Sequence, residues 1–105
     1  MQVKENWSRV VGHVEKWTAP AGRDAPGELV VRVERVGDVK GEGGKPWPNL
    51  LEQAEGSTLR VQVPGSAAAD LDVAEGASVT VDVRRGREPG LVFANPETIR
   101  IRKGR

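Results

Sequence analysis

Apolar and polar residues alternate with a period of two in three stretches of the second half of the chain. In 59–63 the odd positions hold Leu, Val and Val, in 79–83 they hold three valines, and in 99–101 they hold two isoleucines, while the even positions are polar or charged. This alternation is typical of β-strands that bury one face and expose the other. The three stretches therefore predict strands of a small antiparallel barrel or sandwich.

Two earlier strands are predicted over 9–17 and 28–36. Val10, Gly12 and Val14 share one face of the first strand. Because glycine inside a strand often marks a bulge or a close approach of another backbone, Gly12 predicts a strand that bends around a barrel. The opposite face of the first strand holds Val11, His13, Glu15 and Trp17, and one face of the second strand holds Val30, Arg32, Glu34 and Val36.

Glycine and proline divide the strands from one another. The segments 18–27 and 37–57 are predicted as loops, the second of them unusually long for so small a domain. A short helix is predicted over 64–71, with Ser66 as its N-cap. The segment 85–90 is read as a hairpin connection between the fourth and fifth strands.

The last strand is predicted to begin at 91–93 and to resume over 98–102. Asn95-Pro96 interrupts it, because proline has no N–H to donate to a central ladder. The order of three strands, a short helix and two strands predicts an all-β fold, a small five-stranded Greek-key barrel with one short helix between strands 3 and 4.

Length and composition favour one domain over 1–105, with a lead-in at 1–8 and a basic tail at 103–105. The chain has 105 residues, of which 37% are hydrophobic, enough for one modest core. It has no cysteine, so disulfides, thiolate zinc sites and a thiol nucleophile are excluded. No apolar stretch approaches the length of a membrane span or a signal peptide, so a cytoplasmic protein is expected.

The chain resembles the OB-fold superfamily in two segments and in its order of elements. Val11-Gly12-His13-Val14 is similar to the glycine-bent first strand of that superfamily, and 71–81, where Gly76 precedes alternating valines, is similar to its entry into strand four. The resemblance covers about 9–102. It implies an OB-like barrel that binds a partner on the outer face of strands two and three, framed by two loops.

Carried onto this chain, the resemblance implies a surface of arginine, glutamine and tryptophan side chains. The candidate binding residues are Trp17, Arg23, Arg32, Trp47, Arg60, Gln62, Arg85 and Arg87. Trp47 lies between two prolines in the long loop and has two interpretations. Either it closes one end of the barrel as a lid together with Leu50, or it is an exposed stacking platform on a stiffened loop.

The charge distribution is a weak indication of an anionic partner. The net charge is +1, but 77–105 contains seven Lys or Arg against three Asp or Glu. Acidic residues on or beside the proposed face, among them Glu28 and Glu34, would repel phosphate. The sequence has no Tyr, and its single Phe, Phe93, is expected in the core. Arg84, Arg100 and Arg102 are expected to serve solubility.

The sequence favours a non-enzymatic binding module that needs no cofactor or metal ion. No metalloprotease, nucleophile-elbow or phosphate-loop motif occurs, and His13 is expected to face solvent, with Glu15 on the same face as a pH-sensitive contact. A protein-interaction or assembly domain using the barrel face and the long loop is the first hypothesis, with a protein partner or self-association. Single-stranded DNA or RNA bound by Arg contacts and Trp stacking is the alternative, and a small-ligand module is a third.

Overall fold

The computed structural model describes residues 6–22, 25–49, 51–69 and 71–102. Its strands are β1 Ser8–Thr18, β2 Gly27–Asp38, β3 Thr58–Val63, β4 Ser78–Arg85, β5 Leu91–Ala94 and β6 Arg100–Arg102. One short α-helix, α1 Gly65–Ala68, and the 3₁₀ turns η1 Glu42–Gly44, η2 Glu52–Ala54 and η3 Pro96–Thr98 complete the described elements. The predicted all-β fold is confirmed, and each predicted strand is present with its ends shifted by one or two residues.

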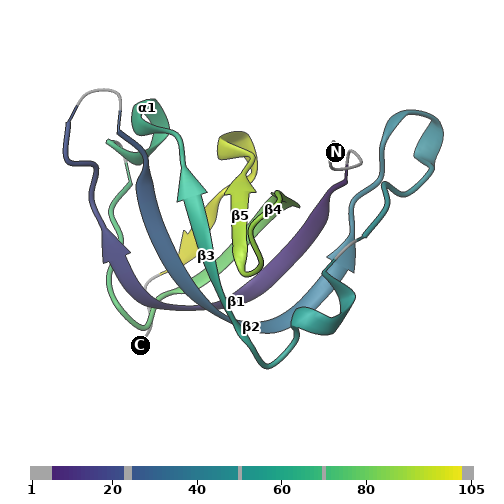
Figure 1. Cartoon of the computed structure of the whole chain (residues 1–105), viewed down its shortest axis with the longest axis horizontal. Helices are drawn as coiled ribbons and strands as arrows, with labels where there is room; N and C mark the ends of the chain where they lie inside the picture. The colour runs from purple at the N-terminus through teal and green to yellow at the C-terminus, as the bar shows by residue number, and fades with distance from the viewer. Residues whose placement is uncertain (1–5, 23–24, 50, 70, 103–105) are drawn as a thin grey trace.

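Five of the strands close into a barrel (Figure 1). The ring runs β1-β2-β3-β5-β4, and β4 pairs back with β1. The β3–β5 pairing is parallel, whereas the other pairings of the ring are antiparallel. The barrel is therefore mixed, although the sequence predicts a purely antiparallel one. The predicted helix, α1, connects β3 to β4. Since β4 and β5 are antiparallel, β5 then runs parallel to β3 and pairs with it. This arrangement is compatible with an OB-like barrel.

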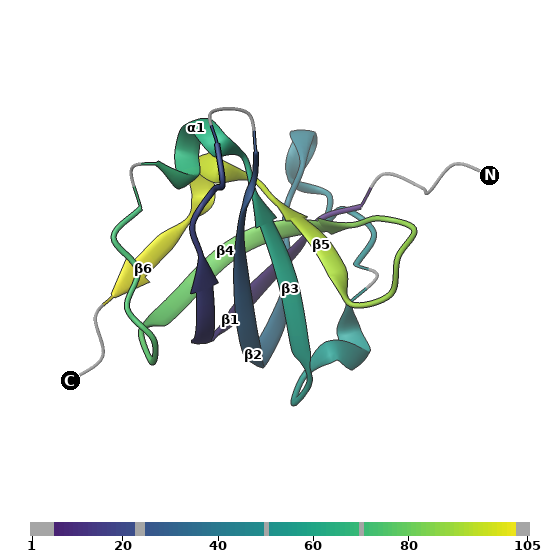
Figure 2. The same cartoon turned by 60° about the vertical axis from the view of Figure 1, so that its left-hand side comes forward.

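β6 is an additional strand outside the five-stranded ring (Figure 2). The turn η3 lifts the chain off β4 after Ala94, and β6 then pairs with the first half of β4. The predicted interruption at Asn95-Pro96 is therefore confirmed. Asn95 supports the turn, since its side chain accepts a hydrogen bond from the backbone N–H of Glu97.

Valine is the commonest residue of the barrel interior. The apolar face predicted from the period of two is buried on every long strand, and its most completely buried members are Leu29, Val10, Val14, Val31, Val33, Val61, Val63, Val79, Val81, Val83 and Val92. Side chains branched at Cβ suit a pleated, buried surface because they lose little rotational freedom there. With no disulfide available, this packing holds the domain together.

Gly12 marks a bulge, as its position in the first strand predicts. The pairing register between β1 and β2 shifts between Val11 and Gly12. A β-carbon built at position 12 would overlap the carbonyl oxygen of Arg32 and lie 3.0 Å from the carbonyl carbon of that residue. Only glycine allows this approach of the β2 backbone.

A second irregularity in β1 overturns the predicted orientation of Trp17. The register shifts between Val14 and Lys16, so Glu15 is an extra residue and Trp17 lies opposite the buried Leu29. Directly paired residues share a face of the sheet. The indole is half-buried against the core and covers Gly27, where a β-carbon would overlap the ring.

The same effect changes the orientation of Val36 in β2. Across the shift, Val11 pairs with Arg35 and Gly12 with Val33, which leaves Glu34 as the extra residue. Val36 consequently pairs with Val10 and packs against the core, whereas strict alternation predicts it outside.

The start of α1 differs from the prediction. Pro64 occupies the N-cap position with no side-chain hydrogen bond, and Ser66 lies inside the helix, exposed to solvent. No helix in the described parts of the chain has both the length and the apolar character to cross a bilayer.

Candidate binding surface

Outward side chains of four neighbouring strands form one row across the barrel. The pairings place Glu28 of β2 beside Gln62 of β3, Gln62 beside Phe93 of β5, and Phe93 beside Arg84 of β4. A second row holds Val30, Arg60 and Leu91. We call this surface the Phe93 face, and its members are Glu28, Val30, Arg60, Gln62, Arg84, Leu91 and Phe93.

Phe93 lies on the outside of the barrel, so its predicted place in the core is wrong. Its relative exposure is 36%, and it is the exposed large hydrophobic side chain of the described residues. The guanidinium carbon of Arg84 lies 5.3 Å from the ring centroid, within reach of a cation–π contact. On the neighbouring connection, a β-carbon at Gly86 would lie 2.8 Å from the ring edge. The ring is therefore held in place by its surroundings while remaining accessible.

The charges at the centre of the Phe93 face are paired with one another. Arg60 Nε donates to Glu28 Oε1 at 3.1 Å, and Gln62 Nε2 donates to the same oxygen at 2.8 Å. Arg60 Nη1 also lies 3.6 Å from Glu88 Oε1. The hydrogen bond to Glu28 raises the pKa of Arg60 above its usual value. The centre of the face is polar but close to neutral.

An open pocket of about 240 Å³ adjoins the exposed ring of Phe93. Pro26, Gln62, Pro64 and Arg84 contribute to its lining. A rigid aromatic beside a partly apolar hollow is the arrangement that anchors a partner side chain in many protein interfaces.

The candidate residues predicted from the sequence are divided among several places. Arg32, Arg60 and Gln62 lie on the outer faces of β2 and β3, as the implied surface requires. Arg85 at the end of β4 and Arg87 in the connection to β5 are exposed. Arg23 lies outside the described residues.

The two candidate tryptophans lie at opposite ends of the β1–β2 ribbon. Trp17 is next to the Thr18–Glu28 pair, whereas the connection that carries Trp47 begins beyond the Ser8–Asp38 pair. In Figure 1 these two connections rise on opposite sides of the molecule. The tryptophans are too far apart to form one stacking surface.

Trp47 packs against its own loop rather than against the barrel. Its backbone N–H donates to Val39 O at 2.8 Å, and its Nε1 would lie 2.8 Å from a β-carbon at Gly41. Trp47 borders an open hollow of about 500 Å³. The buried residue that this connection supplies to the core is Leu51. The lid interpretation is therefore not supported for Trp47, and Leu50 lies outside the described residues.

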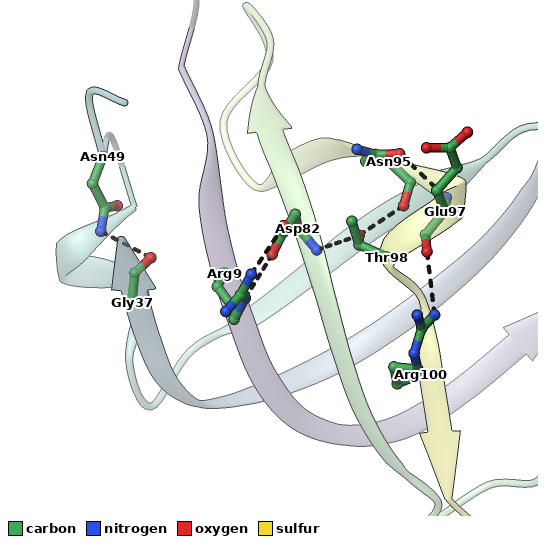
Figure 3. A network of polar contacts seen from close by, with 8 residues as sticks. All are labelled: Arg9, Gly37, Asn49, Asp82, Asn95, Glu97, Thr98 and Arg100. Carbon is green, nitrogen blue, oxygen red and sulfur yellow. Dashed lines mark hydrogen bonds and ion pairs between the residues drawn. The ribbon is translucent and has the colours of Figure 1, made fainter. Parts of the chain in front are cut away.

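Asn49 attaches the long connection to the barrel (Figure 3). Its Nδ2 donates to Gly37 O at 3.4 Å and to Asp38 Oδ1 at 3.1 Å, and its Oδ1 accepts from Ser8 Oγ at 2.7 Å and from the Leu51 N–H at 3.0 Å. Further along, Glu55 Oε2 accepts from the Val36 N–H at 3.0 Å. Asn49 and Glu55 thus form hydrogen bonds with the β2 backbone in the segment that extends past the last β2–β3 pair.

Arg9 and Asp82 form an ion pair between β1 and β4 (Figure 3). Arg9 Nε lies 2.9 Å and Nη2 3.4 Å from the two carboxylate oxygens of Asp82, which is almost completely buried. The hydrogen bond to Asp82 raises the pKa of Arg9. The Asp82 N–H donates to Thr98 Oγ1 at 2.9 Å, which ties η3 to the barrel.

His13 is exposed, as expected, but its acidic neighbour is not Glu15. Its Nδ1 contacts Glu34 Oε1, and Glu15 instead accepts a hydrogen bond from Thr58 Oγ1 at 3.0 Å. The two bulges of the β1–β2 ribbon account for this change of partner, because Glu15 is the extra residue of one bulge and Glu34 is the extra residue of the other.

Sequence reasoning missed Phe93 and Arg84 as surface partners. The signal was present in the alternation itself, because Val92 and Ala94 take the buried positions of β5 and leave position 93 outside. A comparison of the chain with known protein families, curated proteins and solved structures finds no match. The geometry of these surfaces therefore carries the functional argument.

Proposed function

We propose that the protein is a non-enzymatic, OB-like binding module that docks a protein partner on the Phe93 face. The observation that carries this proposal is the exposed ring of Phe93, stacked by Arg84 and set beside Gln62. Aromatic and arginine side chains are enriched among the residues that dominate protein interfaces.

The paired charges of the face favour a protein over a polyanion. The cation of Arg60 is shared between Glu28 and Glu88, and Glu28 lies in the same row as Phe93. A phosphate chain following this row would meet the Glu28 carboxylate at its β2 end, whereas a protein surface can match mixed charge with mixed charge.

Phe93→Ala is expected to weaken partner binding at least about tenfold, the effect of losing one interface hot spot. A photo-crosslinking amino acid at Gln62 would identify the bound chain, and light scattering over a range of concentrations would detect self-association. The same crosslinker at exposed Gln53, on the long connection, is the control. A discrete species captured from position 62, lost with Phe93→Ala and absent from position 53, supports the proposal. A strictly monomeric protein with no such species would overturn it.

Single-stranded nucleic acid on the same face is the alternative, and the stack of Arg84 on Phe93 is the observation that favours it. Nucleobases stack on such platforms, and Arg85 and Arg87 would follow the backbone. Fluorescence anisotropy with mixed-sequence oligonucleotides distinguishes the two. Binding that is lost in both Phe93→Ala and the double variant Arg85→Gln/Arg87→Gln would replace the protein partner with a nucleic acid on this face.

A further inference from the structure

A second outward surface of the barrel is bordered by arginines on both sides. The pairings give one row of Arg35, Val11, Thr80 and Arg100, and a neighbouring row of Arg32, His13, Ser78 and Arg102. Each row crosses β2, β1, β4 and β6 in that order, and each begins and ends with arginine. We call these eight residues the arginine band.

The four arginines lie at the corners of a rectangle. Along the sheet, β2 and β6 are three strand spacings apart, about 14 Å. The two rows are two residues apart on β1, β4 and β6, about 7 Å, and three residues apart on β2, where Glu34 is the extra residue of the bulge. All four side chains are exposed. The floor between them consists of shorter side chains, two of which, Ser78 and Thr80, are hydroxyl donors.

The cations of the band are free of carboxylates within the described chain. Arg32, Arg35 and Arg102 make no ion pair with any described residue. Arg100 donates from Nη1 to the backbone oxygen of Glu97 at 3.2 Å (Figure 3) and to that of Ile99 at 3.0 Å, and neither contact compensates its charge. This is the opposite of the Phe93 face, where the central arginine contacts two carboxylates.

The acidic side chains beside the band, Asp82, Glu34 and Glu15, each have another partner, and Glu15 accepts a hydrogen bond from Thr58 Oγ1 at 3.0 Å. Asp82 is buried and engaged by Arg9. Glu34 lies beside the band and contacts His13, so it faces the imidazole rather than an arginine.

We propose that the arginine band binds the phosphate backbone of a nucleic acid without reading its sequence. Guanidinium groups match phosphate oxygens with two parallel hydrogen bonds, and serine and threonine hydroxyls add neutral donors to the same oxygens. The band contains no Phe, Trp or Tyr, and its one imidazole, His13, is engaged by Glu34, so the contacts of the band are to phosphates. A membrane surface fits less well, because Val11 is the single apolar side chain in the band.

The test is fluorescence anisotropy with a labelled mixed-sequence duplex and a single strand of equal length, titrated at several salt concentrations. Binding in the micromolar range at low salt is expected, with a log–log salt slope of about −3 to −4 for four phosphate contacts. Arg100→Gln/Arg102→Gln is expected to weaken binding roughly tenfold and to reduce the slope by about two. Arg32→Gln/Arg35→Gln should do the same, and Glu34→Gln should tighten binding.

The matched control is Lys40→Gln/Lys45→Gln, which removes the same charge from exposed positions of the long connection, outside the band. It should change affinity by less than about twofold, since distant surface charges are screened at moderate salt. All these variants should retain the thermal unfolding midpoint of the wild-type protein. Equal losses in the band and control variants would overturn the proposal, as would a lack of binding at low salt. Binding to phosphatidylserine vesicles but to neither nucleic acid would also overturn it.

The proposal is independent of the protein partner on the Phe93 face. Phe93→Ala should leave nucleic-acid binding unchanged, and Arg100→Gln/Arg102→Gln should leave crosslinking from position 62 unchanged. Each surface can therefore fail its test without affecting the other.

Discussion

Gly12→Ala is expected to lower the free energy of unfolding by about 3 kcal/mol, the upper part of the range for overpacked sites. The added methyl group would overlap the carbonyl oxygen of Arg32, which belongs to the paired β2 backbone and cannot move aside like a flexible side chain. Relief requires separating β1 from β2 at the bulge. Urea unfolding followed by circular dichroism would measure the change as a lower midpoint.

Gly37→Ala is the matched control for this prediction. Gly37 also lies in β2, but it is exposed and a β-carbon there meets no atom within 4 Å. Its replacement should leave stability unchanged or raise it slightly, since alanine restricts the unfolded chain more than glycine does. An equal midpoint for Gly12→Ala and the wild-type protein would show that the bulge is not constrained as described.

Asn49→Ala is expected to cost about 2 kcal/mol, because it removes the acceptor of the buried Ser8 hydroxyl and leaves that donor without the partner it has now. It also releases the Gly37 carbonyl and the Leu51 N–H. The long connection should then exchange its amide hydrogens faster than the barrel strands do. Hydrogen exchange and urea unfolding together measure both effects.

Asn49→Asp separates the contributions of the two ends of this side chain. It keeps an oxygen for Ser8 and Leu51 but removes the donor to Gly37 and places a second carboxylate next to Asp38. An intermediate loss of stability is expected. Gln53→Ala, at an exposed position on the same connection, should have no effect. If Asn49→Ala behaves like Gln53→Ala, the attachment described for Asn49 contributes nothing to stability.

The alternation of the sequence was sufficient to locate the strands and the buried face of most of them. In 59–63 and 79–83, every apolar residue predicted inside is buried. The pattern failed where a strand gains an extra residue, because each bulge reverses the faces beyond it. Trp17 and Val36 moved to the core for this reason. A bulge depends on the partner strand, so alternation within a single strand cannot reveal it.

The binding surfaces were harder to predict, because they depend on which strands become neighbours. The outer faces of β2 and β3 were expected from the resemblance, and Arg60 and Gln62 lie there. The arginine band joins Arg35 to Arg100 through two intervening strands. Residues so far apart in the chain are brought together only by the registers of three pairings. Arg100 and Arg102 were consequently interpreted as solubilising residues.

The long connection forms hydrogen bonds with the β2 backbone where β2 extends past β3, and these bonds affect aggregation. A valine-rich strand with unpaired amides and carbonyls is a template on which a second molecule can add its own strand. Glu55 takes the Val36 N–H, so an incoming chain finds this position occupied, and Asn49 helps to hold the connection against β2 through its bond to the Gly37 carbonyl. The long connection thus covers the exposed edge of β2. A partner can contact the side chains of the barrel without adding a strand to this edge.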